Sequence, residues 1–235
     1  MNRLLQKMKG LLVCLVLVAS LTYAEENGNR PVLRRVTRQA INGMGGAFLK
    51  QTEANIILNC KSNQLTDSGA IQLQETFDKM KSCLGTKIIF SVPKDEYIQH
   101  LESCGKDAVR ETENCLKSDQ RYFPKFVLDL AKSLVNFMYD DKSALASMEV
   151  TACIRKFATV DVRRNYFECM LDASIRTHDT QEIPHSKGDF CGKFVPAGKC
   201  FPNTMTKYCD HNSNVEKFIS DYTKSLETPC EIKEQ

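Results

Sequence analysis

The sequence lacks the short motifs that mark the common catalytic and metal centres. It has no Cys-x-x-Cys pair, no Gly-x-Ser-x-Gly and no His-Glu-x-x-His, and its four histidines are scattered. A zinc site built on neighbouring cysteines needs short spacings, whereas the closest cysteines here are nine residues apart. A nucleophile needs a base and an orienting partner, which no local pattern supplies. The sequence therefore predicts a non-enzymatic protein without a metal or a cofactor.

Three weaker candidates for catalysis are better interpreted as ordinary structure. Asp67-Ser68-Gly69 is similar to the nucleophile turn of trypsin-like proteases, but it lacks the surrounding glycines and proline and lies where a helix should begin. His178 and His185 lie in a predicted loop at 177–189, without catalytic or metal-binding partners nearby. We expect a helix start at 67–69 and surface positions for both histidines.

Long apolar runs are also scarce. Residues 11–18 form an apolar run that is too short to cross a bilayer, which takes about 20 residues. Basic residues precede this run, and small residues ending at Ala24 follow it, which is the pattern of a secretory signal peptide. We expect residues 1–24 to be cleaved after Ala24, leaving a secreted, extracellular chain without a membrane span.

A concentrated basic surface is missing once the signal peptide is removed. The whole chain has 32 Lys and Arg against 29 Asp and Glu, and residues 1–24 contain three of the basic residues and no acidic one. The mature chain therefore carries 29 of each sign, which excludes nucleic acid as a partner. One short basic cluster lies in residues 25–47, which we expect to form a flexible arm. Its segment Arg35-Val36-Thr37-Arg38 also fits a minimal convertase site.

Cysteine, in contrast, is abundant. The chain has 11 cysteines, and Cys14 leaves with the signal peptide. An even set of ten in an oxidising compartment predicts five disulfides, although the sequence leaves their pairing open. The ten are Cys60, Cys83, Cys104, Cys115, Cys153, Cys169, Cys191, Cys200, Cys209 and Cys230.

Apolar residues recur at helical spacing through residues 48–235, and no alternation of strands and helices is visible. Residues 87–92 are β-branched, but Pro93 follows them, so we expect a connector. A helix at 97–115 either continues through Gly105 or splits there. The predicted fold class is all-α: a single disulfide-stapled helical domain of about seven to nine helices. The clearest helices span 48–62, 66–84, 97–115, 122–139, 142–157, 162–176 and 213–228.

The last of these helices has clear start and stop signals in the sequence. Ser213 and Glu216 have the spacing of a capping box, and Thr228-Pro229 should stop the helix just before Cys230. One face is apolar, through Val215, Phe218, Ile219, Tyr222 and Leu226.

Residues 122–139 are apolar on most sides, which is typical of a helix buried among others. The same helix could line a cavity for an apolar ligand. The candidate wall residues are Phe126, Leu130, Leu134, Phe137 and Met138.

The C-terminal stretch resembles the insect 27 kDa haemolymph protein family. The similar residues are Cys191-Gly192-Lys193-Phe194, Cys200 and Cys209, the amphipathic helix that closes on Thr228-Pro229-Cys230, and, further upstream, residues 137–153. The resemblance implies an abundant secreted protein of insect body fluid without established enzymatic activity. It also implies that Cys191, Cys200, Cys209 and Cys230 are disulfide partners. Members of the family have been described as glycoproteins, yet this chain has no Asn-x-Ser/Thr sequon.

Two functions follow from these features. The first is a secreted binding or carrier protein for an apolar small molecule or an extracellular protein partner. The second is a structural, storage or protein-interaction role in body fluid. The sequence leaves the ligand and the oligomeric state open.

Overall fold

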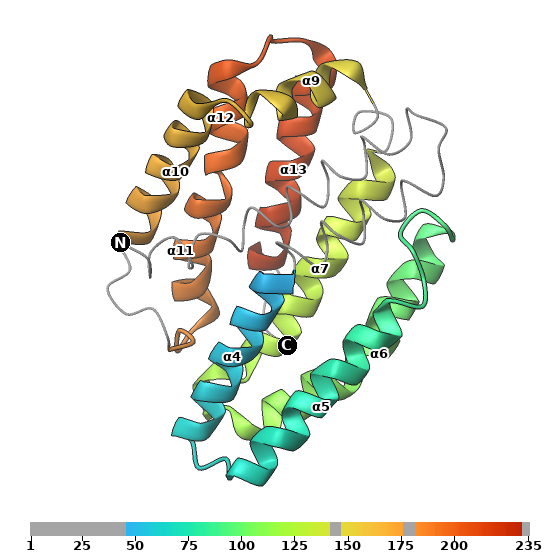
Figure 1. The fold of residues 1–235 in the computed structure, drawn as a ribbon, viewed down its shortest axis with the longest axis vertical. Coiled ribbons are helices and arrows are strands. Elements are labelled where there is room, and N and C mark those ends of the chain that lie inside the picture. Colours follow the sequence, from blue (N-terminus) through green and yellow to red (C-terminus); the bar gives the residue numbers. More distant parts are fainter. Residues whose placement is uncertain (1–45, 142–146, 176–181, 232–235) are drawn as a thin grey trace. The chain divides into compact units, whose positions relative to one another are not determined.

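The computed structural model describes residues 46–141, 147–175 and 182–231 (Figure 1). The expected signal peptide, and most of the expected arm at 25–47, lie outside these residues. The described part contains nine α-helices and one 3-10 turn, and no strand, so the predicted all-α class is confirmed. None of its helices combines the length and apolar character that crossing a membrane requires. The elements are α4 (Gly46–Ser62), α5 (Asp67–Leu84), α6 (Lys94–Cys115), η2 (Ser118–Gln120), α7 (Tyr122–Asp140), α9 (Met148–Lys156), α10 (Val160–Ile175), α11 (Lys187–Gly198), α12 (Cys200–Tyr208) and α13 (Ser213–Glu231).

The chain divides into two compact units. Unit 1 takes in residues 1–51, 140–178 and 193–224, and unit 2 takes in residues 52–139, 179–192 and 225–235. Helices α4, α11 and α13 contribute residues to both. That residues 48–235 form a single domain therefore stays a prediction.

Unit 2 is built on the α5–α6 helix pair, which lies side by side in Figure 1, together with α4 and α7. Thr66 caps α5, because its hydroxyl accepts the N–H of Gly69 at 3.1 Å, and Gly85 ends the helix as predicted. Helix α6 continues unbroken through Gly105. The buried core residues are Ile56, Cys60, Leu73, Phe77, Ala108, Leu116, Phe123 and Ile183.

The connector between α5 and α6 is irregular, as predicted for residues 87–92. Phe90 has a positive φ of 65°, and its backbone N–H donates to the Tyr139 hydroxyl at 2.9 Å. That hydroxyl in turn donates to the Val92 carbonyl at 2.9 Å. One tyrosine therefore satisfies two backbone groups of the connector.

Unit 1 is packed around aromatic rings from four helices or their ends. The ring of Phe201 on α12 lies 5.0 Å from that of Phe157 and 5.3 Å from that of Tyr222. Tyr166 on α10 contacts Phe157 in an edge-on arrangement at 5.8 Å. Phe201, Tyr166, Tyr222 and Phe218 are fully buried, which makes this cluster the centre of the unit.

The ten cysteines form five disulfides, which confirms the predicted disulfide framework. Each bond lies within one unit. Of the four C-terminal cysteines that the family resemblance singles out, two pair with each other and two pair with cysteines of α9 and α10. The pairs are Cys60–Cys115, Cys83–Cys104 and Cys191–Cys230 in unit 2, and Cys153–Cys209 and Cys169–Cys200 in unit 1.

Helix α13 differs from its prediction at both ends. Asn212, and not Ser213, is the cap, because Asn212 Oδ1 accepts the N–H groups of Asn214 and Val215 at 3.1 Å each. The predicted stop at Thr228-Pro229 is wrong, since the helix continues to Glu231. Pro229 cannot donate to the Ser225 carbonyl four residues earlier, and the Ser133 hydroxyl donates to that carbonyl instead, at 2.8 Å. The predicted apolar face is buried at Val215, Phe218, Tyr222 and Leu226, and half-buried at Ile219.

Candidate functional site

The five candidate cavity residues all lie on α7, and they differ in burial. Phe126 and Phe137 are only 3% and 5% exposed. Leu130, Leu134 and Met138 are half-buried. The helix is therefore not enclosed on every apolar side, although its sequence is apolar over most of its circumference.

The half-buried residues follow one line along the helix. At about 100° per residue, Leu134 and Met138 fall at the middle of the apolar arc of α7, and Leu130 lies next to them. The buried Phe126 and Phe137 lie on one flank of this arc, and the buried Val135 lies on the other. We call Leu130, Leu134 and Met138 the α7 stripe. It is an apolar strip with buried side chains on both sides, and it is the part of the predicted cavity wall that remains accessible.

The histidines that were considered for catalysis do not form a catalytic group in the described residues. His178 lies outside them. The Nδ1 of His185 is 2.7 Å from Asp119 Oδ2, and the side chain is more than half exposed, as the surface interpretation expects. Asp67-Ser68-Gly69 is the first turn of α5.

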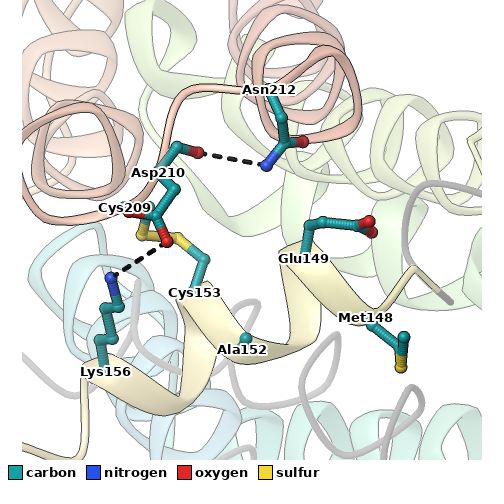
Figure 2. A pocket seen from close by; sticks show the side chains of 8 residues that line it. All are labelled: Met148, Glu149, Ala152, Cys153, Lys156, Cys209, Asp210 and Asn212. Carbon is teal, nitrogen blue, oxygen red and sulfur yellow. Dashed lines mark hydrogen bonds and ion pairs between the residues drawn. A yellow bond between two sulfur atoms is a disulfide. The ribbon is translucent and has the colours of Figure 1, made fainter.

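A separate pocket of about 300 Å³ lies in unit 1 (Figure 2). Glu149, Ala152 and Lys156 project from α9 on one side of it. Asp210 and Asn212 line the other side, from the connection between α12 and α13. The Cys153–Cys209 disulfide joins these two sides, and Met148, which is 73% exposed, lies at the end of α9.

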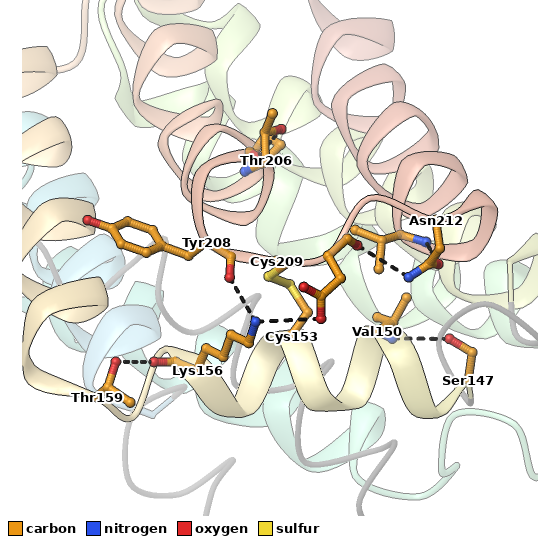
Figure 3. Close-up of a disulfide and its surroundings, with 12 residues drawn as sticks. Ser147, Val150, Cys153, Lys156, Thr159, Thr206, Tyr208, Cys209 and Asn212 are labelled. Atoms are coloured by element: carbon orange, nitrogen blue, oxygen red, sulfur yellow. Dashed lines mark hydrogen bonds and ion pairs between the residues drawn. A yellow bond between two sulfur atoms is a disulfide. The ribbon is translucent and has the colours of Figure 1, made fainter.

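The polar groups of this pocket are already engaged with one another (Figures 2 and 3). Lys156 Nζ donates to the Tyr208 carbonyl at 2.9 Å and lies 3.8 Å from Asp210 Oδ2. Asn212 Nδ2 donates to the Asp210 carbonyl at 3.2 Å. Lys156 therefore links α9 to the end of α12 beside the disulfide, and its charged group has a structural role.

Glu149 has an electrostatic environment that favours its ionised form. Its own backbone N–H and, next, the Asn214 side chain donate to the carboxylate, and these bonds lower the pKa of Glu149 below its usual value. The residue lies in the first turn of α9, where the helix dipole also favours a negative charge. The pocket therefore offers two carboxylates, one ammonium group and amides, and it suits a small polar molecule better than an apolar one.

The sequence gives no signal for this pocket. Glu149 and Lys156 lie seven residues apart on one face of a predicted helix, which is ordinary for a solvated surface. Their meeting with Asp210 depends on the Cys153–Cys209 pairing, which cannot be deduced from the sequence.

One cluster with metal-ligating chemistry was also missed. Cys83, His100 and Cys104 each offer one ligand atom, and these three atoms lie within 4.8 Å of one another. His100 and Cys104 are four residues apart on α6, so the His-x-x-x-Cys spacing was visible in the sequence. In the structure Cys83 and Cys104 are joined as a disulfide, and His100 lies beside them.

Comparisons of the chain with protein-family models, with curated proteins and with solved structures found no match. The resemblance of the C-terminal stretch to the insect haemolymph proteins therefore stays a prediction.

Proposed function

We propose that this protein is a secreted, non-enzymatic binding protein that carries an apolar small molecule against the α7 stripe. The observation that carries the proposal is the partial exposure of Leu130, Leu134 and Met138 between buried flanks. Removing apolar surface from water contributes about 25 cal/mol per Å². An apolar ligand would therefore gain affinity by covering the exposed parts of these three side chains.

Secretion is supported by two independent features. Five disulfides in one chain are characteristic of oxidising compartments and are rare in the cytosol. Residues 1–24 also have the pattern of a signal peptide. The resemblance to insect haemolymph proteins points in the same direction, toward a soluble protein of body fluid.

The chemistry of the two candidate sites favours the α7 stripe for an apolar ligand. The unit 1 pocket is lined by Glu149, Lys156 and Asp210, and covering these groups with an apolar molecule would cost part of their hydration. The stripe presents two leucines and a methionine, and methionine adapts well to ligands of varied shape.

Displacement of a fluorescent fatty acid tests the proposal. We expect saturable binding of the probe at micromolar protein, and competition by unlabelled fatty acid. Leu134→Gln places an amide in the middle of the stripe and should weaken binding by about tenfold or more. Because Leu134 is half-buried, the variant should keep its helical circular dichroism.

Leu128→Gln is the matched control, because Leu128 is a half-buried leucine of the same helix outside the stripe. Its side chain lies against α6 at Gly105, where Leu128 Cδ1 is 3.4 Å from the position of an added Cβ. This variant should lose stability and keep its affinity for the probe. Absence of probe binding, or equal weakening by both variants, would overturn the proposal.

The second candidate is a storage, structural or protein-interaction role in the same fluid. The disulfide framework favours it, since cross-links limit unfolding and therefore proteolysis. Probe binding would count against a pure storage role. If Leu134→Gln instead abolished capture of an extracellular protein, the stripe would be a protein-docking surface.

A further inference from the structure

The Cys83–Cys104 disulfide lies directly beside the imidazole of His100. Cys104 Sγ is 3.6 Å from His100 Nδ1 and 3.7 Å from Nε2. Cys83 lies in the last turn of α5, and the other two residues lie one helical turn apart on α6. The imidazole therefore gives this disulfide a polar, metal-binding neighbour.

The packing of two helices, and not the sulfur–sulfur bond alone, holds Cys83, His100 and Cys104 close together. α5 and α6 pack against each other and are joined by residues 85–93. Phe77 of α5 and Ala108 of α6 are buried in the same hydrophobic cluster. The two sulfur atoms should therefore stay close together after the bond between them is broken.

Breaking this bond should also destabilise the folded protein less than breaking any of the other four, because the unfolded chain gains less conformational entropy. The Cys83–Cys104 separation is 21 residues, whereas the other bonds span 31 to 56. The stabilisation from a cross-link grows with the length of the loop that it closes. Cys83 is half-buried and Cys104 is buried, so the Cys83 side of this bond is the more accessible one for a reductant.

Thr86 orients the imidazole. The Thr86 hydroxyl donates to the Cys83 carbonyl at 2.7 Å, which leaves the hydroxyl oxygen able to accept a hydrogen bond. That oxygen lies 3.5 Å from His100 Nε2. An Nε2–H directed at Thr86 leaves Nδ1 without a proton and able to bind a metal, in the manner of the outer-shell partners that orient metal-binding histidines.

We propose that reduction of the Cys83–Cys104 bond creates a zinc site formed by Cys83, Cys104 and His100. A dithiol reductant supplies two electrons and two protons, the sulfur–sulfur bond breaks, and the reductant becomes its own disulfide. Zn²⁺ then replaces the two thiol protons, which go to solvent, and neutral His100 coordinates through Nδ1. Two thiolates and one imidazole are ligands that zinc prefers, and the fourth position is left for water or another ligand.

The test uses the full mature chain, treated with increasing amounts of a phosphine or dithiol reductant. Differential alkylation with peptide mapping should report Cys83 and Cys104 as the first pair to be reduced. Zinc alone, titrated against a chromophoric chelator, should then bind at one equivalent, and the oxidised protein should bind none at the same site. Cobalt should give thiolate charge-transfer bands and the visible bands of a tetrahedral ion.

Three variants make the result specific. His100→Ala should weaken zinc binding by more than about tenfold, and Thr86→Val should weaken it about tenfold through loss of the orienting contact. His185→Ala, which removes an exposed histidine elsewhere in unit 2, should leave binding unchanged. Circular dichroism at each step checks that the helices persist.

The proposal is overturned if another disulfide is reduced first, or if the helices are lost when this bond opens. It is equally overturned if His100→Ala binds zinc as tightly as the unaltered chain. None of these outcomes bears on the apolar ligand, because the α7 stripe is tested on the oxidised protein.

Discussion

Asn59 and Ile183 lie 124 residues apart in the chain and are joined by a hydrogen bond, in which the Ile183 N–H donates to Asn59 Oδ1 at 3.0 Å. The side chain of Gln120, which is fully buried, donates to the Ile183 carbonyl at 2.7 Å. Two buried amide side chains therefore satisfy both backbone groups of one residue and anchor the segment before α11 onto the core of unit 2.

The first prediction follows from this arrangement. Gln120→Met keeps the volume of the side chain and leaves the Ile183 carbonyl without its donor, so the free energy of unfolding should fall by about 1–3 kcal/mol. Urea denaturation measures this change in the free energy of unfolding. Gln72→Met, at an exposed position of α5, is the control and should change stability by less than about 0.5 kcal/mol. Equal effects of the two substitutions would show that the buried hydrogen bond is unimportant.

The second prediction concerns Lys217 and Asp141. Asp141 is 1% exposed and Lys217 is 55% exposed, and Lys217 Nζ lies 2.6 Å from Asp141 Oδ1. Lys217→Met leaves a buried carboxylate without this partner, so it should cost about 1–3 kcal/mol. Lys125→Met removes a surface lysine whose partner Asp129 lies four residues along the same helix, and it should cost less than about 1 kcal/mol.

The same pair predicts the response to alkaline pH. Hydrogen bonds to Asp141 and then Asp221 raise the pKa of Lys217 above its usual value. A raised pKa in the folded state means that the stabilisation is complete below the pKa of an unfolded lysine, about 10.4, and is lost as pH rises beyond it. The free energy of unfolding should therefore decline above about pH 10, and this decline should be smaller in Lys217→Met. An identical pH profile for the two proteins would contradict the assignment.

The fourth prediction compares two disulfides. Replacing both cysteines of the Cys153–Cys209 bond with alanine should cost about 2–5 kcal/mol. The 56-residue separation of this pair, against 21 for Cys83–Cys104, makes its loss about 1 kcal/mol worse in the chain-entropy description. Denaturant melts of the two double variants test the order, and the reverse order would show that local strain or packing outweighs loop length.

Helical periodicity was sufficient to predict the fold class and several helix boundaries. The start of α5 was correct, because the cap that Thr66 provides depends on residues within one turn. The predicted cap of α13 was wrong by one residue, since Asn212 and Ser213 are both good caps and the local sequence does not choose between them. The helix continued past Pro229 because Ser133, distant in sequence, supplies the missing donor.

The candidate sites were predictable to different degrees. The α7 residues could be named from their pattern, but the pattern did not separate the buried Phe126 and Phe137 from the half-buried stripe. The cluster around His100 forms because Cys83 of α5 pairs with Cys104 of α6. It could not be predicted, because the sequence alone does not determine which cysteines pair. Residues 187–208 form α11 and α12, although Pro196 and three glycines weaken the helical signal there.

Native mass spectrometry of the protein from its natural source tests the central proposal most directly. We predict the mass of the chain from residue 25 with five disulfides, together with a non-covalent apolar molecule that organic solvent extracts and that Leu134→Gln fails to retain. Recovery of the bare polypeptide, combined with no binding of added fatty acid at micromolar protein, would contradict the proposed carrier function.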